Sequence, residues 1–190
     1  MTFGSGARRD FFRDAFGRWV EQLLDDTRVR VSPKEYLRPP GALPEVAFLA
    51  ACTRCSECVT VCPPKAILRV PADGGLAAGT PYILPTLQPC VVCSDLPCIA
   101  ACPTEALTLP TRGWAGYRMG VLELVPERCI TFNGAACAAC AEACPVGEQA
   151  LAMDEAGHPV IRAEGCVGCG VCVRACVTLP SSFKLRPVEA

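Results

Sequence analysis

Sixteen regularly spaced cysteines are the residues of this chain that could do chemistry. They fall into four quartets, each ending in a gap of three residues. The spacing is C-x2-C-x2-C-x3-C in the first and fourth quartets, C-x2-C-x4-C-x3-C in the second and C-x7-C-x2-C-x3-C in the third. Proline follows the first three quartets, and Val177 follows the fourth. In chain order the quartets are Cys52, Cys55, Cys58, Cys62; Cys90, Cys93, Cys98, Cys102; Cys129, Cys137, Cys140, Cys144; and Cys166, Cys169, Cys172, Cys176.

This spacing is typical of ligands for 4Fe-4S clusters. Such a cluster offers iron corners to thiolates, and cysteines three residues apart can wrap around three of them. The fourth cysteine lies one helical turn further on and faces away, and in two-cluster ferredoxins it binds the other cluster. The proline then turns the chain outward, because it cannot continue a backbone hydrogen-bond ladder. We therefore predict four 4Fe-4S clusters with all sixteen cysteines as iron ligands, in pairs of sites that exchange their fourth cysteines.

Two other uses of cysteine fit less well. A disulfide framework needs an oxidising compartment, and runs of cysteines three residues apart are poorly placed for bridging. Zinc knuckles would leave the third close cysteine and the proline unexplained. Loss of a single cluster site stays open for the third quartet, where Cys129 must reach its iron across residues 130–136. A turn at Asn133-Gly134 would close that gap.

Short strands are expected between the quartets. Three segments after a quartet begin with Ala followed by Ile or Leu, and each has a later segment that can return as the second strand of a hairpin. Turn residues such as Asp73-Gly74-Gly75 separate the first pair. Short ligand-bearing helices with hairpins between them predict an α+β fold. The strand pairs are 66–70 with 82–84, 106–109 with 120–125, and 150–153 with 160–162.

Composition and charge exclude several function classes. The formal net charge of −1 gives no electrostatic footprint for nucleic acid. His158 is the sole histidine, so zinc sites with two histidines, Rieske centres and Cys-x-x-Cys-His haem attachment are excluded. An oxidised 4Fe-4S cluster with its four thiolates carries about −2, so four would bring the total to about −9, which favours redox protein partners with basic surfaces. No constellation of serine, aspartate or glutamate suggests a substrate pocket, and we predict no catalytic residue.

The N-terminal segment bears on location. Arg8-Arg9 resembles a twin-arginine export signal, but charged residues interrupt everything after it, and no apolar segment follows. Residues 8–26 read as an amphipathic helix within an N-terminal region of residues 1–37. The longest uncharged stretch, residues 74–94, contains glycines and prolines and is not a transmembrane helix. We expect a cytoplasmic protein, or a periplasmic one if the arginine pair is a working export signal.

Beyond the cysteines, several short segments make the chain resemble the NapG/MauM type of ferredoxin-like protein. The resemblance covers roughly residues 38–187, and Val177 after the last quartet belongs to its pattern. The segments are Arg38-Pro39-Pro40-Gly41-Ala42, Ala78-Gly79-Thr80-Pro81-Tyr82, Pro97-Cys98, Arg118-Met119-Gly120, Cys176-Val177 and Lys184-Leu185-Arg186-Pro187.

The resemblance implies an electron-transfer protein of periplasmic nitrate reduction or methylamine oxidation. In that role it would relay single electrons between a donor, quinol-linked or another dehydrogenase, and a terminal oxidoreductase, and contact with a membrane-bound partner is compatible with it. A related cytoplasmic type, NapF-like, also holds four clusters and implies the alternative, an accessory protein that uses its clusters for assembly or redox sensing of a reductase.

The exchange of fourth cysteines leaves open which quartets pair. Sequence order would pair the first quartet with the second and the third with the fourth. We predict nested pairing instead, because the first and fourth quartets share the regular spacing, and because the four-cluster electron-transfer subunits that the chain resembles are nested. The ligand sets are then Cys52, Cys55, Cys58 with Cys176; Cys166, Cys169, Cys172 with Cys62; Cys90, Cys93, Cys98 with Cys144; and Cys129, Cys137, Cys140 with Cys102.

This pairing fixes the expected domain organisation. Residues 38–190 form one four-cluster domain of two ferredoxin-like dicluster modules. The inner module, residues 80–156, carries the second and third quartets and is inserted into the outer one, residues 45–72 and 158–187.

Overall fold

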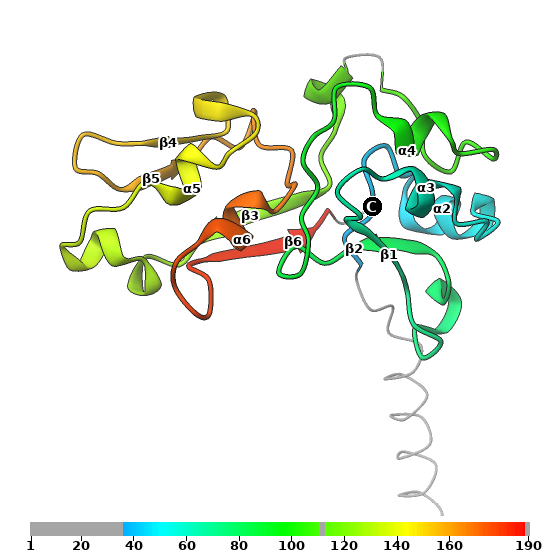
Figure 1. Ribbon diagram of the computed structural model, residues 1–190, viewed down its shortest axis with the longest axis horizontal. Coiled ribbons are helices and arrows are strands. Elements are labelled where there is room, and N and C mark those ends of the chain that lie inside the picture. Colours follow the sequence, from blue (N-terminus) through cyan, green and yellow to red (C-terminus); the bar gives the residue numbers. More distant parts are fainter. Residues whose placement is uncertain (1–35, 111–112, 189–190) are drawn as a thin grey trace, which may run out of the picture. The chain divides into compact units, whose positions relative to one another are not determined.

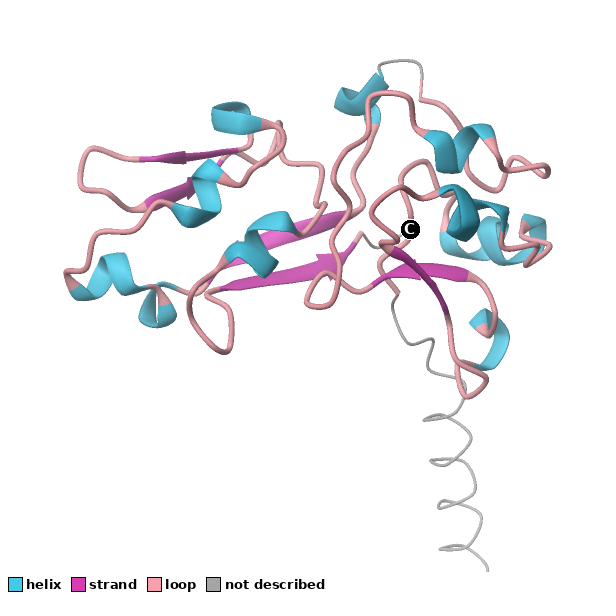
Figure 2. Ribbon diagram, viewed as in Figure 1, coloured by secondary structure: helices cyan, strands magenta, loops and turns pink. Residues whose placement is uncertain are grey.

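The structure is a computed structural model that describes residues 36–110 and 113–188, all within one compact unit (Figures 1 and 2). It has the predicted α+β character, with short helices and three two-stranded antiparallel sheets in the described residues. The Arg8-Arg9 pair and the helix predicted for residues 8–26 lie outside them. Within the described ranges, no helix has the length and apolar character needed to span a bilayer.

Four of the five described α-helices carry cysteines. Helix α3 begins after Ser56, which has a left-handed backbone, and ends before Cys62, which is extended. Pro63 explains this end, because the residue before a proline is pushed out of the helical region. The α-helices are α2 (Glu45–Ala51), α3 (Glu57–Val61), α4 (Pro97–Ala100), α5 (Ala139–Glu142) and α6 (Val171–Ala175). The 3-10 turns are η1 (Gly75–Ala77), η2 (Gly113–Gly116), η3 (Pro126–Arg128), η4 (Ile130–Asn133) and η5 (Gly147–Gln149).

Two of the three predicted hairpins are confirmed. Strand β1 (Ile67–Arg69) pairs with β2 (Pro81–Ile83), and β4 (Leu151–Met153) pairs with β5 (Pro159–Ile161). Asp154 closes the second hairpin, because its Oδ1 accepts a 2.7 Å hydrogen bond from the backbone N–H of His158.

The third hairpin prediction is wrong in its partner. Strand β3 (Gly120–Leu124) forms as expected but pairs with β6 (Phe183–Pro187) in the register Leu122 opposite Leu185. Residues 106–109 lie instead beside the segment around Ala42. There the N–H of Thr108 donates to the Gly41 carbonyl at 2.7 Å, and the N–H of Leu43 donates to the Ala106 carbonyl at 3.1 Å. A Cβ on Gly41 would overlap the Thr108 carbonyl, so this close pairing requires glycine.

These pairings divide the described residues into two similarly built halves. In the first half (36–110) and in the second half (119–188), the segment before the earlier quartet pairs with the segment after the later one. Helix α3 packs against α4 in the first half, and α5 packs against α6 in the second. The predicted insertion of an inner module, residues 80–156, into an outer one is therefore wrong. Each half closes on itself because its terminal segments satisfy one another's backbone hydrogen bonds.

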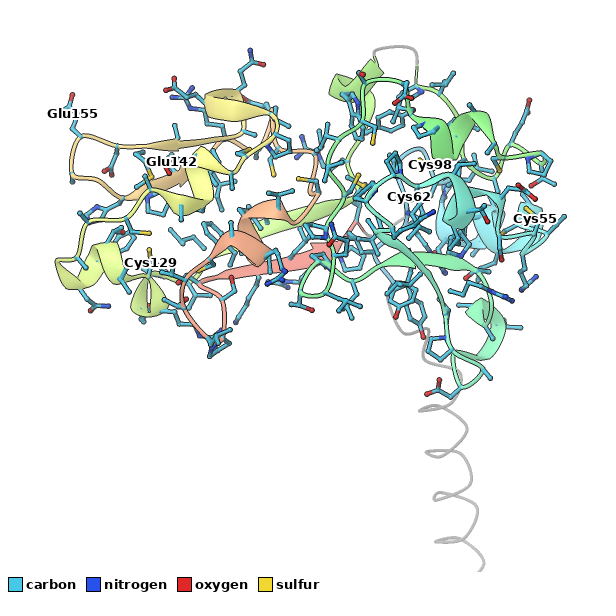
Figure 3. The ribbon with its side chains drawn as sticks, viewed as in Figure 1. Cys55, Cys62, Cys98, Cys129, Glu142 and Glu155 are labelled. Atoms are coloured by element: carbon cyan, nitrogen blue, oxygen red, sulfur yellow. The ribbon has the colours of Figure 1, made fainter. Side chains whose placement is uncertain are left out.

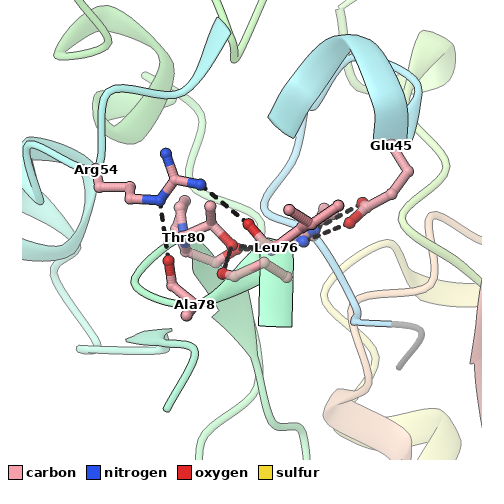
Figure 4. Close-up of polar contacts among 8 residues, drawn as sticks. Glu45, Arg54, Leu76, Ala78 and Thr80 are labelled. Carbon is pink, nitrogen blue, oxygen red and sulfur yellow. Dashed lines mark hydrogen bonds and ion pairs between the residues drawn. The ribbon is translucent and has the colours of Figure 1, made fainter. Parts of the chain in front are cut away.

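A buried arginine ties the start of the first half together. The Arg38 guanidinium bonds both carboxylate oxygens of Glu45, at 2.9 Å from Nε and 2.5 Å from the other donor nitrogen. It also donates to Thr80 Oγ1 at 2.9 Å and to the Pro81 carbonyl at 2.8 Å, and it lies 4.7 Å from the centre of the Phe48 ring. Figure 4 shows Glu45 and Thr80 in this network. Helix α2 and strand β2 are thus joined through one side chain.

Candidate metal centres

All sixteen cysteines lie in the described residues, and none of them is in a disulfide. The structure gathers them into four sets, each combining three cysteines of one quartet with the last cysteine of its neighbour in the same half. We call these sets site 1 (Cys52, Cys55, Cys58, Cys102), site 2 (Cys62, Cys90, Cys93, Cys98), site 3 (Cys144, Cys166, Cys169, Cys172) and site 4 (Cys129, Cys137, Cys140, Cys176).

Site 1 is a cavity lined by its four cysteines together with Phe48 and Arg54. Burial, followed by the neighbouring thiols of Cys52 and Cys55, raises the pKa of Cys58 to about 12. Cys55 is the exposed thiol of the set. The Arg54 guanidinium spans the rim, donating to the Ala78 and Leu76 carbonyls at 2.9 and 3.0 Å (Figure 4).

Site 2 is a cavity lined by its four cysteines, Trp114 and apolar residues. Burial raises the pKa of Cys90 to about 12. Burial and the thiol of Cys62 raise the pKa of Cys98 to about 11, so the fourth cysteine of the first quartet lies among those of the second. The indole N–H of Trp114 donates to the Cys93 carbonyl at 2.9 Å and fixes the rim.

Site 4 is a cavity whose lining includes both ends of the long gap in the third quartet. Turn η4 folds the gap back on itself and ends at Gly134, whose φ is +85°. The N–H of Ala135 then donates to the Ile130 carbonyl at 3.0 Å. Cys129 and Cys137 therefore line the same cavity. The predicted Asn133-Gly134 turn is confirmed.

Site 3 combines the buried thiols of Cys169 and Cys172 with the half-buried thiols of Cys144 and Cys166. Burial raises the pKa of Cys172, and the thiols of Cys169, Cys166 and Cys144 raise it further, in that order. Burial also raises the pKa of Cys169 to about 11, and among the thiols that of Cys144 contributes most. The fourth cysteine of the third quartet thus lies among those of the fourth.

The nested ligand sets expected from the sequence are wrong. Cys102, not Cys176, lines the cavity of Cys52, and Cys176 lines the cavity of Cys129. Fourth cysteines are exchanged as expected, but between consecutive quartets. The reason is topological: each half closes its own sheet, so the helices that face one another carry quartets adjacent in the sequence.

Left-handed backbone lets the short loops wrap these sites. Positive φ occurs between the cysteines at Arg54 (+60°), Ser56 (+71°), Val92 (+58°) and Leu96 (+46°), where a side chain costs about 1–3 kcal/mol each. In the fourth quartet the corresponding positions are Gly168 and Gly170, which adopt positive φ without that cost. Valine rarely adopts a left-handed backbone, so nothing in the sequence indicated the positive φ of Val92.

Several cysteine sulfurs accept hydrogen bonds from the chain. The N–H of Ala66 donates to Cys62 Sγ at 3.3 Å, and the N–H of Ser182 donates to Cys176 Sγ at 3.3 Å. Burial raises the pKa of Cys176, but the Thr178 hydroxyl and the Ser182 and Thr178 N–H groups outweigh it and lower the pKa to about 7. Donors of this kind favour the charged form of the sulfur.

Threonine hydroxyls near the sulfurs were missed by sequence reasoning. Thr178 Oγ1 lies 3.2 Å from Cys176 Sγ, and Thr131 Oγ1 lies 3.2 Å from Cys129 Sγ, so both belong to site 4. Thr104 is 3.9 Å from Cys102 Sγ in site 1. All three follow the pattern Cys-x-Thr, which could have drawn attention to them. The pattern alone is insufficient, because Thr60 follows it too and donates to the Ser56 carbonyl instead.

The donor set fits iron-sulfur clusters. In the described ranges, no three His, Cys, Asp or Glu side chains are placed to hold a single metal ion. In sites 1, 2 and 4 the thiols line a cavity that leaves space between them. Soft thiolates from four cysteines are the ligands that 4Fe-4S clusters take.

The chain is similar to curated ferredoxin-type proteins. Ferredoxin-type protein NapG of Escherichia coli is 36% identical over 164 residues, covering 80% of this chain and 71% of the relative. Methylamine utilization ferredoxin-type protein MauM of Methylophilus methylotrophus is 34% identical over 199 residues, covering 96% of this chain and 87% of the relative. Ferredoxin-type protein NapF of Escherichia coli is 28% identical over 144 residues, or 74% of this chain and 79% of the relative. No protein-family model and no solved structure match the chain.

Proposed function

The chain belongs to the family of NapG and MauM ferredoxin-type proteins, which are iron-sulfur electron-transfer proteins, and from this premise we propose that it holds one 4Fe-4S cluster at each of sites 1 to 4 and relays electrons through them. The single observation that carries the proposal is the grouping of the cysteines. Four cysteines from two quartets line each of three cavities, and the remaining four lie together at site 3. Each half would then hold a ferredoxin-like pair of clusters.

When bound, the clusters supply one-electron redox chemistry at potentials that hydrogen bonds and burial adjust. The residues of the chain hold and orient the thiolates. Phe48 and Trp114 line sites 1 and 2 and limit the access of water. Thr131 and Thr178 place hydroxyl donors at site 4, and the N–H of Ala66 places a donor at site 2. The proposal gives the chain no catalytic residue, because its role is to accept, pass on and release electrons.

Redox proteins are the proposed partners. An electron donor and a terminal oxidoreductase are both required for a relay, and four bound clusters would make the holoprotein strongly acidic, at about −9. Basic surfaces on the partners would then speed their encounter with it.

Metal and sulfide analysis tests the cofactor assignment. Anaerobically purified protein should contain about sixteen iron atoms and sixteen acid-labile sulfides per chain, as four cubane clusters require. About twelve iron atoms per chain, together with a spectrum of three clusters, would point to site 4 as the site that fails to hold a cluster. Zinc in place of iron would refute the proposal.

Reoxidation kinetics test the electron-transfer role against the accessory role. The dithionite-reduced protein is mixed anaerobically with the terminal oxidoreductase of its own organism in a stopped-flow spectrometer. An electron-transfer protein should be reoxidised within one turnover of that enzyme. Tight complex formation without reoxidation would favour the accessory alternative.

A further inference from the structure

The loop of the fourth quartet contacts the first half through Gly170. A Cβ on Gly170 would lie 2.4 Å from Cβ and 2.7 Å from Cγ of Pro85, a residue of the first half that stands five residues before Cys90. Gly168 holds the same loop against its own half, because a Cβ there would overlap the backbone N and O of Gly120 at the start of β3. The N–H of Met119, also in the second half, donates to the Val167 carbonyl at 2.9 Å. The loop can approach Pro85 this closely only because Gly170 has no side chain.

Cys169 is buried in the core of the first half. It belongs, with Val167, to the cluster of buried residues that contains Cys62 and Cys98 of site 2. Cys172, three residues further along, belongs to the separate cluster of the second half, which also contains Cys140 of site 4. Site 3 therefore reaches both halves, with Cys169 facing site 2.

The buried clusters also link the neighbouring sites within each half. Cys58 of site 1 lies in the same buried cluster as Cys98 of site 2. Cys172 of site 3 lies in the same buried cluster as Cys140 of site 4.

We infer that Gly170, by letting its loop approach Pro85, holds site 3 against site 2, and that electrons would cross between the two halves at this junction. The inference rests on the proposed function and deepens it, because it orders the sites as 1, 2, 3, 4. Cys55 of site 1 and Cys129 of site 4 then mark the two ends, and Figure 3 shows them far apart with Cys62 and Cys98 between them. The step moves one electron from site 2 to site 3, or back, oxidising one and reducing the other with no bond made or broken.

Electron paramagnetic resonance of the full chain tests the order of the sites. Cys55→Ala and Cys137→Ala together remove the outer clusters and should leave about eight iron atoms per chain. In the reduced state, the clusters at sites 2 and 3 should broaden each other's signal through spin-spin interaction. The opposite pair, Cys93→Ala with Cys166→Ala, leaves sites 1 and 4 and should give two unbroadened signals. Two isolated signals from the first variant, with its iron present, would overturn the inference.

A glycine variant tests the junction itself. Adding Gly170→Ala to the chain that keeps sites 2 and 3 should reduce the broadening while the iron content stays the same. Gly157→Ala is the matched control, because Gly157 has a similar positive φ (+79° against +82° at Gly170) but no atom within 4 Å of a Cβ built there. Broadening that survives Gly170→Ala unchanged would show that the contact with Pro85 does not position site 3.

The two proposals fail separately. A wild-type chain without iron and sulfide refutes the proposed function, whereas a fully loaded chain whose inner sites do not interact refutes only the junction. If Gly170→Ala prevents folding, the comparison of the two cysteine variants still decides the order of the sites.

Discussion

Replacing Thr178 with valine should lower the reduction potential of the cluster at site 4. In a thiolate bound to iron, the sulfur can only accept, so the Thr178 hydroxyl, 3.2 Å away, donates to it. Reduction adds negative charge to the cluster and its sulfurs, and the hydrogen bond is then stronger in the reduced state. Valine has nearly the same shape and removes the donor alone.

The magnitude follows from the strength of one such bond. Hydrogen bonds to charged groups contribute about 1.5–3 kcal/mol, and if about 0.5–1 kcal/mol of this differs between the two redox states, the potential falls by about 20–40 mV for a one-electron couple. Thr131→Val removes the second hydroxyl of site 4, also at 3.2 Å, and should lower the potential by a similar amount. The two threonines contact different sulfurs, so the double variant should show roughly the sum.

A redox titration followed by electron paramagnetic resonance measures these shifts, with one of the four midpoint potentials moving. Ser182→Ala should give a smaller shift, because its hydroxyl lies 2.9 Å from Thr178 Oγ1 and acts on the sulfur only through it. Thr60→Val is the matched control, since that hydroxyl donates to a carbonyl. An unchanged or raised site 4 potential in Thr178→Val, with full iron content, would refute the reasoning.

Three other changes have distinct expected outcomes. Arg38→Ala should lower the free energy of unfolding of the holoprotein by about 2–4 kcal/mol in urea titrations, because Glu45 loses its partner; equal stability would contradict the importance of this ion pair. Gly41→Ala should cost more than about 2 kcal/mol in thermal melts, because φ is +77° and a Cβ overlaps the Thr108 carbonyl, whereas Gly134→Ala, with open space, should cost about 1 kcal/mol. Iron chelation under reducing conditions should abolish the circular-dichroism signal of folded structure, because bound iron-sulfur clusters would supply the crosslinks between the short helices and two-stranded sheets of each half; a cooperative melt of the apoprotein would disprove this.

Local features were predictable from the sequence because their causes are local. The β1–β2 hairpin follows from apolar segments on either side of Asp73-Gly74-Gly75, and the Asn133-Gly134 turn follows from residues that tolerate a left-handed backbone. The partner of β3 was not predictable in this way. Its partner, β6, begins about sixty residues later in the chain. Nothing in the residues of β3 favours β6 over residues 106–109 as the strand with which β3 pairs.

The composition of the cysteine sets was likewise predictable only in part, because spacing is local and the pairing of quartets is not. Spacing indicates that each quartet contributes to metal sites, but Cys102 and Cys176 are alike in their surroundings along the chain, and each follows its quartet's third cysteine at the same distance. Which of them joins Cys52 depends on how the halves close, and that is decided by strand pairs far apart in sequence. The strained backbone of Val92 was also unpredictable, because the loop imposes it against the preference of the residue.

Closure within each half also sets the order in which the protein can be built. Domains fold as units during synthesis, with the N-terminal part first. All eight cysteines of sites 1 and 2, and the segment around Leu107 that closes their half, precede every cysteine of sites 3 and 4 in the chain. The first half can therefore emerge from the ribosome complete, and an assembly machine can load its two sites, before the second half has been fully translated. A nested chain would instead have to stay empty at Cys52 until Cys176 emerged, with its thiols open to oxidation for the whole of that time.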